Sequence, residues 1–164
     1  LNKLLEQRAY TDAHTGLPNK DACEVLLNNK ETVAKHTACM MFDLNNLKII
    51  NDTKGHSKGD QLILNFARLL RNVIPQKDFV GRYGGDEFMV VIYNTSKTEI
   101  EDILKQLSRE KDRLNSSGNN MPIDYACGWA ISDADSECTI QMLLDKADYY
   151  MYENKQAYKK SKKS

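Results

Sequence analysis

The sequence predicts an α+β fold with a mainly antiparallel central sheet flanked by helices. Strand-like segments are few and helical patterns are several, which is typical of helices packed on a small sheet. Residues 37–42 form a continuous apolar run whose length suits a central strand buried on both faces. Strand-like segments on both sides of Gly84-Gly85-Asp86-Glu87 predict a β-hairpin, which would supply two neighbouring strands.

Apolar residues at helical spacing place helices before, between and after these strands. Asn19, Ser96 and Thr139 each precede such a pattern and are expected N-caps, and Glu99 would complete a capping box with Ser96. Pro75 ends the helix that we expect to begin at Asp60. The expected elements, in order, are helix 1–10, helix 20–27, strand 37–42, helix 46–52, helix 60–74, hairpin 79–93, helix 96–114, strand 123–131 and a last helix from 139.

The composition fits one globular domain, because 164 residues with 41% hydrophobic and 28% charged side chains can bury a substantial core. The 23 basic and 23 acidic residues cancel, so we expect neither a nucleic-acid partner nor direct membrane contact. Four scattered cysteines without a CxxC pair indicate free, mostly buried thiols in a reducing compartment. No apolar run reaches the length of a membrane span, so we expect a cytoplasmic domain, either free or at the cytoplasmic end of a receptor.

We divide the chain into three parts. Residues 1–10 begin without a cap, and we interpret them as the end of a longer upstream signalling helix. Residues 11–159 would form the functional domain. Residues 160–164 would be a basic, solvated tail.

Three carboxylates draw attention to one end of the predicted sheet. Asp43 follows the apolar strand, where burying an unpaired carboxylate is costly, so a site residue is more common there than a surface residue. Asp86 and Glu87 are adjacent at the hairpin tip and repel each other unless a cation or solvent relieves the repulsion. Taken alone, the tip is equally consistent with a solvated acidic turn.

Four sequence blocks occur in one order and together resemble the GGDEF family of bacterial diguanylate cyclases. They are Asp12-x-x-Thr15-Gly16-Leu17-Pro18-Asn19, the run from Phe42 to Asp52, Gly55-His56-x-x-Gly59-Asp60, and Arg82-Tyr83-Gly84-Gly85-Asp86-Glu87-Phe88. The resemblance covers nearly the whole chain, from Thr11 to Lys159. It implies a fold like the palm of polymerases and nucleotidyl cyclases, and the synthesis of cyclic di-GMP from two GTP with release of pyrophosphate.

The resemblance also implies a divalent metal site. Asp43, the carbonyl of Leu44 and Asp86 would hold Mg²⁺, with Mn²⁺ as an alternative, because hard oxygen ligands suit these ions. Lys48 would stabilise charge on the reacting phosphates, and Asp86 and Glu87 would be catalytic. Glu87 would assist the attacking hydroxyl as a base or through a second metal, and which acidic residue takes the proton stays open.

The same resemblance assigns the GTP contacts. Asn51 and Asp60 would read the guanine edge, because a carboxylate accepts hydrogen bonds that adenine cannot offer. Backbone amides at Asn46 and Leu47 would hold the terminal phosphates at a helix start. The remaining expected contacts come from His56, Arg82, Lys155 and Lys159. For the two lysines, which share one helix face, a solvated surface is the alternative.

The symmetry of the product bears on the expected partners. Each domain would bind one GTP, so a two-fold product implies a two-fold homodimer, aligned by an upstream sensor. The main alternative is a degenerate GGDEF module that binds GTP or a partner domain without turnover, although the intact Gly84-Gly85-Asp86-Glu87-Phe88 favours an enzyme. A nucleotidyl transferase of the polymerase type is less favoured, because no basic groove or nucleic-acid-binding domain is recognisable.

A few positions depart from the family pattern. Asn45 replaces a frequent Asp, Leu47 a frequent Phe and His14 a usual Leu, so we expect altered metal affinity and a looser N-terminal loop. The family's product-inhibition motif is Arg-x-x-Asp, and here Pro75 stands at the Arg position before Asp78. Because proline has no guanidinium group, we predict no feedback inhibition through that site.

Overall fold

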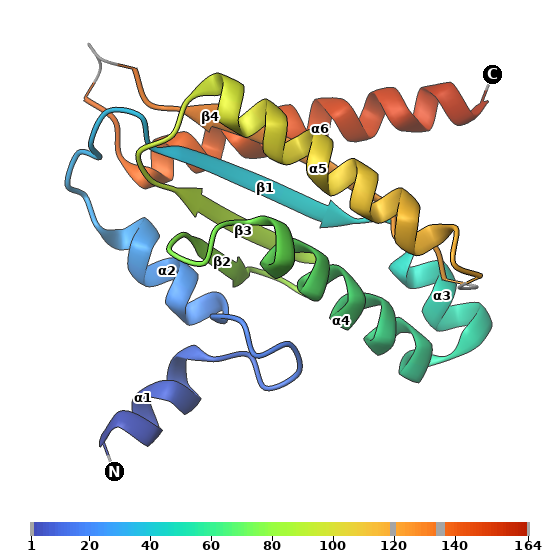
Figure 1. The fold of residues 1–164 in the computed structure, drawn as a ribbon. Coiled ribbons are helices and arrows are strands. Elements are labelled where there is room, and N and C mark those ends of the chain that lie inside the picture. Colours follow the sequence, from blue (N-terminus) through green and yellow to red (C-terminus); the bar gives the residue numbers. More distant parts are fainter. Residues whose placement is uncertain (1, 119–120, 134–136, 164) are drawn as a thin grey trace.

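The computed structural model describes residues 2–118, 121–133 and 137–163, which form six helices and four strands (Figure 1). The helices are α1 (Asn2–Tyr10), α2 (Lys20–Asn28), α3 (Leu47–Lys54), α4 (His56–Val73), α5 (Lys97–Asn115) and α6 (Ile140–Lys163). The strands are β1 (Ala38–Leu44), β2 (Phe79–Arg82), β3 (Glu87–Ile92) and β4 (Tyr125–Ile131).

The strands form one antiparallel sheet in the order β2-β3-β1-β4, which confirms the predicted fold class. β1 lies inside the sheet and pairs with β3 along one side and with β4 along the other. Every residue of β1 is buried, as its continuous apolar run predicts. Met40 in the middle of β1 is opposite Val90 of β3 and Trp129 of β4, and this register decides which residues meet at the strand ends.

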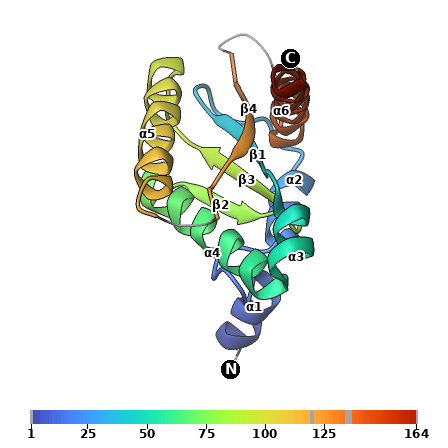
Figure 2. The same cartoon turned by 90° about the vertical axis from the view of Figure 1, so that its right-hand side faces the viewer.

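Helices cover both faces of the sheet (Figure 2). α4 and α5 lie on one face and share a core with Met40, Phe42 and Leu44 of β1. α2 and α6 lie on the other face and share a core with Cys39 and Met41. Because successive side chains of a strand point to opposite faces, one apolar run supplies both cores.

Close packing fixes the helices against the sheet. On the α4 face, the rings of Phe66 and Phe88 meet edge to face with their centroids 5.1 Å apart. On the α6 face, Gly128 of β4 has no side chain, and a Cβ atom there would lie only 2.1 Å from the carbonyl oxygen of Ala147. α6 therefore lies directly on β4, and Lys155, about two turns beyond Ala147, reaches the end of β1.

α1 has no buried residue and extends away from the sheet (Figure 1). Asn19 joins it to the domain, because its side chain donates to the Ala9 carbonyl at 2.9 Å and its backbone N–H donates to the Tyr10 carbonyl at 3.0 Å. The Asn19 side chain also accepts from the Ala22 amide, which confirms the predicted N-cap of α2. Backbone hydrogen bonds to the hydroxyls of Ser96 and Thr139 confirm the other two caps.

The start of α4 differs from the predicted one. The helix begins at His56 rather than at Asp60, because Gly55 alone, with a φ of +91°, separates it from α3. Gly59 lies within the first turns of α4 and is buried. In the sequence, Gly59 suggests a loop between two helices. In the structure it lies inside a continuous helix and allows close packing.

Smaller corrections apply to other boundaries. β1 continues through Asp43 to Leu44, since both residues pair with β4. β4 begins at Tyr125 rather than at residue 123. The predicted basic tail is helical to Lys163, while Leu1 and Ser164 lie outside the described residues.

The predicted capping box is only half formed. The Glu99 carboxylate accepts from the Thr95 hydroxyl at 3.0 Å instead of reaching back to the Ser96 backbone. The cysteines agree with the prediction, because all four are free and Cys23, Cys39 and Cys138 are buried. None of the described helices combines the length and the apolar character needed to cross a lipid bilayer.

Candidate active site

The hairpin turn and the end of β1 meet at one edge of the sheet. Asp43 is the direct partner of Glu87 in the β1–β3 ladder. Just beyond this pair, the Leu44 N–H donates to the Asp86 carbonyl at 2.8 Å. Asp43, Asp86 and Glu87 are therefore brought together from two strands that are distant in the sequence.

The three carboxylates influence one another electrostatically. Asp43 is only 8% exposed, and Asp86 and Glu87 are partly buried. Burial, followed by the neighbouring charge of Asp43, raises the pKa of Asp86 above its ordinary value. Burial and then the charges of Asp43 and Asp86 raise the pKa of Glu87 in the same way. Negative charge is concentrated at an edge that would be stabilised by a cation.

Lys155 supplies one positive charge to this cluster. Its Nζ lies 2.5 Å from Asp43 Oδ2, and both side chains are mostly shielded from solvent. The same ammonium partly offsets the rise in the pKa of Asp86 and of Glu87. The other oxygen of Asp43, Oδ1, is buried and has no hydrogen-bond partner among the described residues.

A pocket of about 620 Å³ opens beside these charges, which is within the range of small-molecule sites. Its walls are the connection from β1 into α3, the hairpin and the C-terminal half of α6. The lining residues are Leu44, Asn45, Asn46, Leu47, Lys48, Ile49, Asp86, Lys155, Tyr158 and Lys159. Three lysines beside an acidic edge suit a polyanion that binds together with a cation.

Asn46 turns the chain from β1 into α3 at the wall of this pocket. It has a left-handed φ of 70°, a conformation that asparagine tolerates better than most residues. α3 begins at the next residue, Leu47, and the first N–H groups of a helix have no partner within the helix. The predicted phosphate-binding amides therefore lie at the pocket.

The predicted guanine contacts lie on α3 and at the start of α4. A Cβ atom on Gly59 would be 1.7 Å from Asn51 Oδ1 and 3.3 Å from Leu47 Cδ1, so both side chains pack against this glycine. His56 and Asp60 are exposed on α4, and neither lines the 620 Å³ pocket. The structure thus places the predicted base contacts around α3 and α4, apart from the predicted phosphate contacts.

Arg82 contacts protein groups rather than the pocket, in contrast to the predicted substrate contact. Its Nη1 lies 3.2 Å from Asp12 Oδ2, and its Nη2 donates to the Gly85 carbonyl at 2.9 Å. Burial would raise the pKa of Asp12, but hydrogen bonds from Thr15 and Arg82 outweigh burial and lower it. Arg82 therefore ties the N-terminal loop to the hairpin turn.

Two of the departures from the family pattern make specific contacts. The His14 ring is hydrogen-bonded through Nε2 to the Asp60 carbonyl at 2.8 Å, so the N-terminal loop gains a contact with α4 where looser packing was expected. The sequence signalled this only as a polar residue at a usually apolar position. Asn45 donates from Nδ2 to Asp124 Oδ2 at 3.4 Å, a contact that an aspartate at position 45 would turn into repulsion.

The positions of the product-inhibition motif are engaged within the protein. Asp78 is 5% exposed, and its Oδ1 accepts from the Tyr93 backbone N–H at 3.1 Å. Arg71 Nη2 donates to the Pro75 carbonyl at 2.8 Å and covers the turn. Asp78 therefore holds the end of β3 in place.

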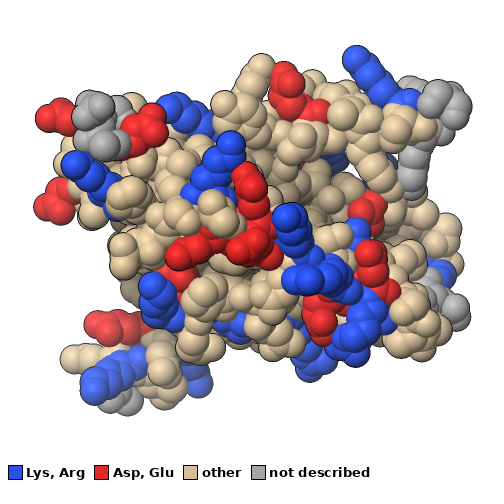
Figure 3. Space-filling view, turned by 45° about the horizontal axis from the view of Figure 1, so that its top comes forward, with Lys and Arg blue, Asp and Glu red and all other residues tan. Residues whose placement is uncertain are grey.

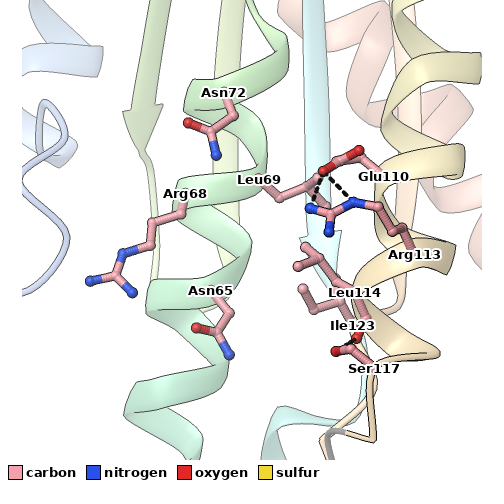
Figure 4. A pocket seen from close by; sticks show the side chains of 9 residues that line it. All are labelled: Asn65, Arg68, Leu69, Asn72, Glu110, Arg113, Leu114, Ser117 and Ile123. Carbon is pink, nitrogen blue, oxygen red and sulfur yellow. Dashed lines mark hydrogen bonds and ion pairs between the residues drawn. The ribbon is translucent and has the colours of Figure 1, made fainter.

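A second hollow, of about 320 Å³, lies between α4 and α5 (Figure 4). Arg113 is paired there with Glu110, and Leu69, Leu114 and Ile123 contribute apolar surface. None of the predicted site residues lines it.

Charged side chains form a pattern on the face of the molecule that Figure 3 shows. Acidic atoms gather near the middle of this face, and basic atoms border them.

A comparison with known protein families gives a match that includes the residues of this candidate site. The family model described as "Diguanylate cyclase, GGDEF domain" matches residues 9–161. The chain belongs to the GGDEF family. The match includes both strands that carry the carboxylates and all of the residues that line the 620 Å³ pocket.

This chain matches one part of each of several longer curated relatives. It is 31% identical over 164 residues to the signaling protein YkoW of Bacillus subtilis, covering 96% of this chain and 20% of that protein. It is 30% identical over 165 residues to the diguanylate cyclase DgcP of Escherichia coli, covering 98% of this chain and 48% of that protein. It is 31% identical over 150 residues to the cyclic di-GMP phosphodiesterase PdeB of Shewanella oneidensis, covering 90% and 17%. The chain therefore spans less than half the length of these relatives.

Solved structures show the same architecture. A microbial GGDEF domain studied with cyclic di-GMP is 26% identical, with a TM-score of 0.78 and coverage of 93% of this chain and 94% of that one. The GGDEF domain of YfiN (TpbB) from Pseudomonas aeruginosa is 28% identical, with a TM-score of 0.72 and coverage of 90% and 89%. The GGDEF domain described here has their palm-like fold.

The carboxylate edge suits a hard divalent cation. Asp43 Oδ1 is a buried acceptor without a partner, and the Asp86 carboxylate lies beside that of Asp43. Within the described residues, no group of three or more His, Cys, Asp or Glu side chains forms a complete metal site. Mg²⁺ is commonly held by one or two carboxylates together with substrate phosphates, so the donors present fit a site that the nucleotide completes.

Proposed function

We propose that this domain is a diguanylate cyclase, which condenses two GTP into cyclic di-GMP and releases pyrophosphate. The observation that carries the proposal is the pairing of Asp43 with Glu87 beside a pocket that three lysines line. Membership in a family whose model is named for this activity supports it. Nucleotidyl transfer from a triphosphate requires carboxylates that can hold a divalent cation next to a pocket that can hold the phosphates.

Asp43, Asp86 and the Leu44 carbonyl would hold Mg²⁺ or Mn²⁺. An ion held there would lower the pKa of an attacking 3′-hydroxyl and neutralise charge on the leaving pyrophosphate. Glu87 would assist the attacking hydroxyl as a base or through a second metal. Lys48 would face the charge that develops on the reacting phosphates.

The remaining residues would bind and orient GTP. The first amides of α3 and the side chains of Lys155 and Lys159 would hold the phosphates. Asn51 and Asp60 would read the guanine edge, and His56 would line the base site. Arg82 would act indirectly, by fixing the hairpin turn through Gly85.

Two such domains would have to meet face to face, because each would supply one GTP to a two-fold symmetric product. In the whole protein, an upstream sensor would control that meeting through the helix that ends at residue 10. Residues 11–159 would be the catalytic unit, working in the cytoplasm.

The direct test is incubation with GTP and Mg²⁺ over a range of protein concentrations, with the product identified by mass. We expect cyclic di-GMP, with a specific activity that rises with protein concentration as dimers form. Glu87→Gln serves as the matched inactive control. A specific activity that does not depend on concentration would contradict the dimeric mechanism.

A second candidate is a GGDEF module that binds GTP without turnover. It is favoured by one finding, the similarity to relatives that are named cyclic di-GMP phosphodiesterases, including PdeB and NbdA. GTP binding without product at any protein concentration would establish this candidate and refute the first.

A further inference from the structure

The ion pair between Lys155 and Asp43 bears on how cation and nucleotide bind. Lys155 Nζ lies 2.5 Å from Asp43 Oδ2, on a carboxylate that is also the innermost acidic group of the site. The side chain of Lys155 is 30% exposed and that of Asp43 is 12% exposed, so water screens the pair only weakly. The ammonium therefore takes up part of the negative charge that a divalent cation would use.

Lys155 also lines the 620 Å³ pocket, together with Lys48 and Lys159. Its four-carbon stem is flexible, so the same ammonium can face the carboxylate or turn toward an anion in the pocket. Lys159, one helical turn further on, lines the pocket but is exposed. The two lysines thus offer similar charge to the pocket, while only Lys155 is paired with Asp43.

We propose that Lys155 is an exchangeable counter-ion, which neutralises Asp43 until a nucleotide triphosphate draws it away, so that the domain binds a divalent cation strongly only together with nucleotide. This inference rests on the proposed function, because it concerns the same cation and triphosphate. An ammonium next to Asp43 repels an incoming divalent cation. The same ammonium turned toward the triphosphate removes that repulsion and adds an attraction.

The exchange makes the two ligands cooperative. By linkage, the factor by which nucleotide strengthens cation binding must equal the factor by which the cation strengthens nucleotide binding. A domain that binds the bare cation only weakly also keeps Asp43 paired with Lys155 until substrate arrives. Lys155 would therefore set the order of loading.

The test measures Mn²⁺ binding to the 164-residue chain without nucleotide, by electron paramagnetic resonance of free Mn²⁺. Lys155→Met keeps most of the stem and removes the charge. We expect it to bind bare Mn²⁺ about tenfold more tightly than the wild type, within the usual range of coupling between sites. Lys159→Met, which removes the same charge one turn away, should change the bare Mn²⁺ affinity by less than about twofold, because exposed charges are strongly screened.

A second measurement repeats the titration with a non-hydrolysable GTP analogue. The analogue should strengthen Mn²⁺ binding to the wild type by a factor that Lys155→Met reduces. Thermal melting checks that each variant is folded, and Lys155→Arg, which keeps the charge, should behave like the wild type without nucleotide. If folded Lys155→Met binds bare Mn²⁺ no more tightly than the wild type, the exchange is refuted.

Failure of the proposed function gives a different result. If the analogue binds to neither protein, the domain does not use GTP. Tighter bare Mn²⁺ binding by Lys155→Met would then still establish competition between the lysine and the cation. If the analogue binds but its effect on Mn²⁺ is equal in both proteins, the exchange is refuted while GTP binding stands.

Discussion

Asp43 on β1 and Glu87 on β3 are direct partners across the sheet, so two carboxylates that are 44 positions apart in the chain share one edge. Lys155 reaches the same edge from α6. Charge repulsion within this cluster is thus built into the strand register. It has measurable consequences for stability as well as for binding.

Replacing Glu87 with Gln should stabilise the domain at neutral pH. Burial and the charges of Asp43 and Asp86 raise the pKa of Glu87, so its ionisation costs stability as pH rises through the elevated pKa. We expect the Tm to increase by about 1–3 °C at pH 7, because roughly 1 kcal/mol corresponds to about 2–4 °C and solvent screens part of the effect. Below the ordinary carboxyl pKa both side chains are neutral, and the difference should vanish. Calorimetry from acidic to neutral pH measures it, and a Tm difference that does not depend on pH would contradict this account.

Replacing Asp12 with Asn should destabilise the domain by about 1–2 kcal/mol, because it weakens the charge-assisted hydrogen bonds from Thr15 and Arg82. The pKa of Asp12 is lowered, so its contribution is present above the ordinary carboxyl pKa and is lost as pH falls through the lowered pKa. Urea unfolding at neutral and acidic pH should show the gap closing in acid. Glu101→Gln, which removes an exposed ion pair with Lys97, is the control and should cost less than about 0.5 kcal/mol.

Replacing Gly59 with Ala should separate base recognition from stability. The added methyl group favours the helix by about 0.5–1 kcal/mol, but it would lie 1.7 Å from Asn51 Oδ1 and must push that side chain away. We expect the affinity for a GTP analogue to fall about tenfold while the Tm stays within roughly 4 °C of the wild type. If Asn51 is the group affected, Asn51→Ala should lose as much and the double variant no more. Additive losses in the double variant would exclude this mechanism.

If the domain is a cyclase as proposed, cyclic di-GMP should not inhibit it through the turn before the hairpin. Pro75 has no guanidinium group, and Asp78 already accepts the Tyr93 N–H. Initial rates measured with micromolar added product should match those without it. Asp78→Asn should instead reduce stability by about 1 kcal/mol, because the weaker oxygen of a neutral amide replaces the carboxylate oxygen that accepts the Tyr93 N–H. Product inhibition that disappears in Asp78→Asn would refute this prediction.

The sequence alone predicted the features of the fold that depend on residues close together in the chain. The continuous apolar run predicted the buried central strand, and Asn19, Ser96 and Thr139 predicted three helix starts. The prediction of the start of α4 was wrong at Gly59. The sequence alone does not distinguish a glycine in a loop from a helical glycine that leaves room for a side chain of another helix.

The sequence predicted which residues would form the candidate site, but not which residues each of them contacts. Arg82 pairs with Asp12, which is 70 positions away, and Lys155 pairs with Asp43, which is 112 positions away. Charged residues at such separations have many equivalent partners until the fold selects one. Motif resemblance therefore proposed the site residues, while the packing of α6 on Gly128 and the turn at Gly85 determined what Lys155 and Arg82 contact.

The central place of β1 has a consequence for how the protein is made. β1 leaves the ribosome first among the strands, yet one of its two neighbours, β4, begins only at Tyr125, and α6 follows still later. Pairing between such distant segments is slow compared with helix formation. Until the last quarter of the chain has emerged, Asp43 has Glu87 beside it on β3 but lacks both β4 and the lysine that neutralises it. The nascent domain can therefore form its acidic edge well before Lys155 is available to pair with it, and a fragment that ends at Asp124 should leave the β1 amides that face β4 open to hydrogen exchange.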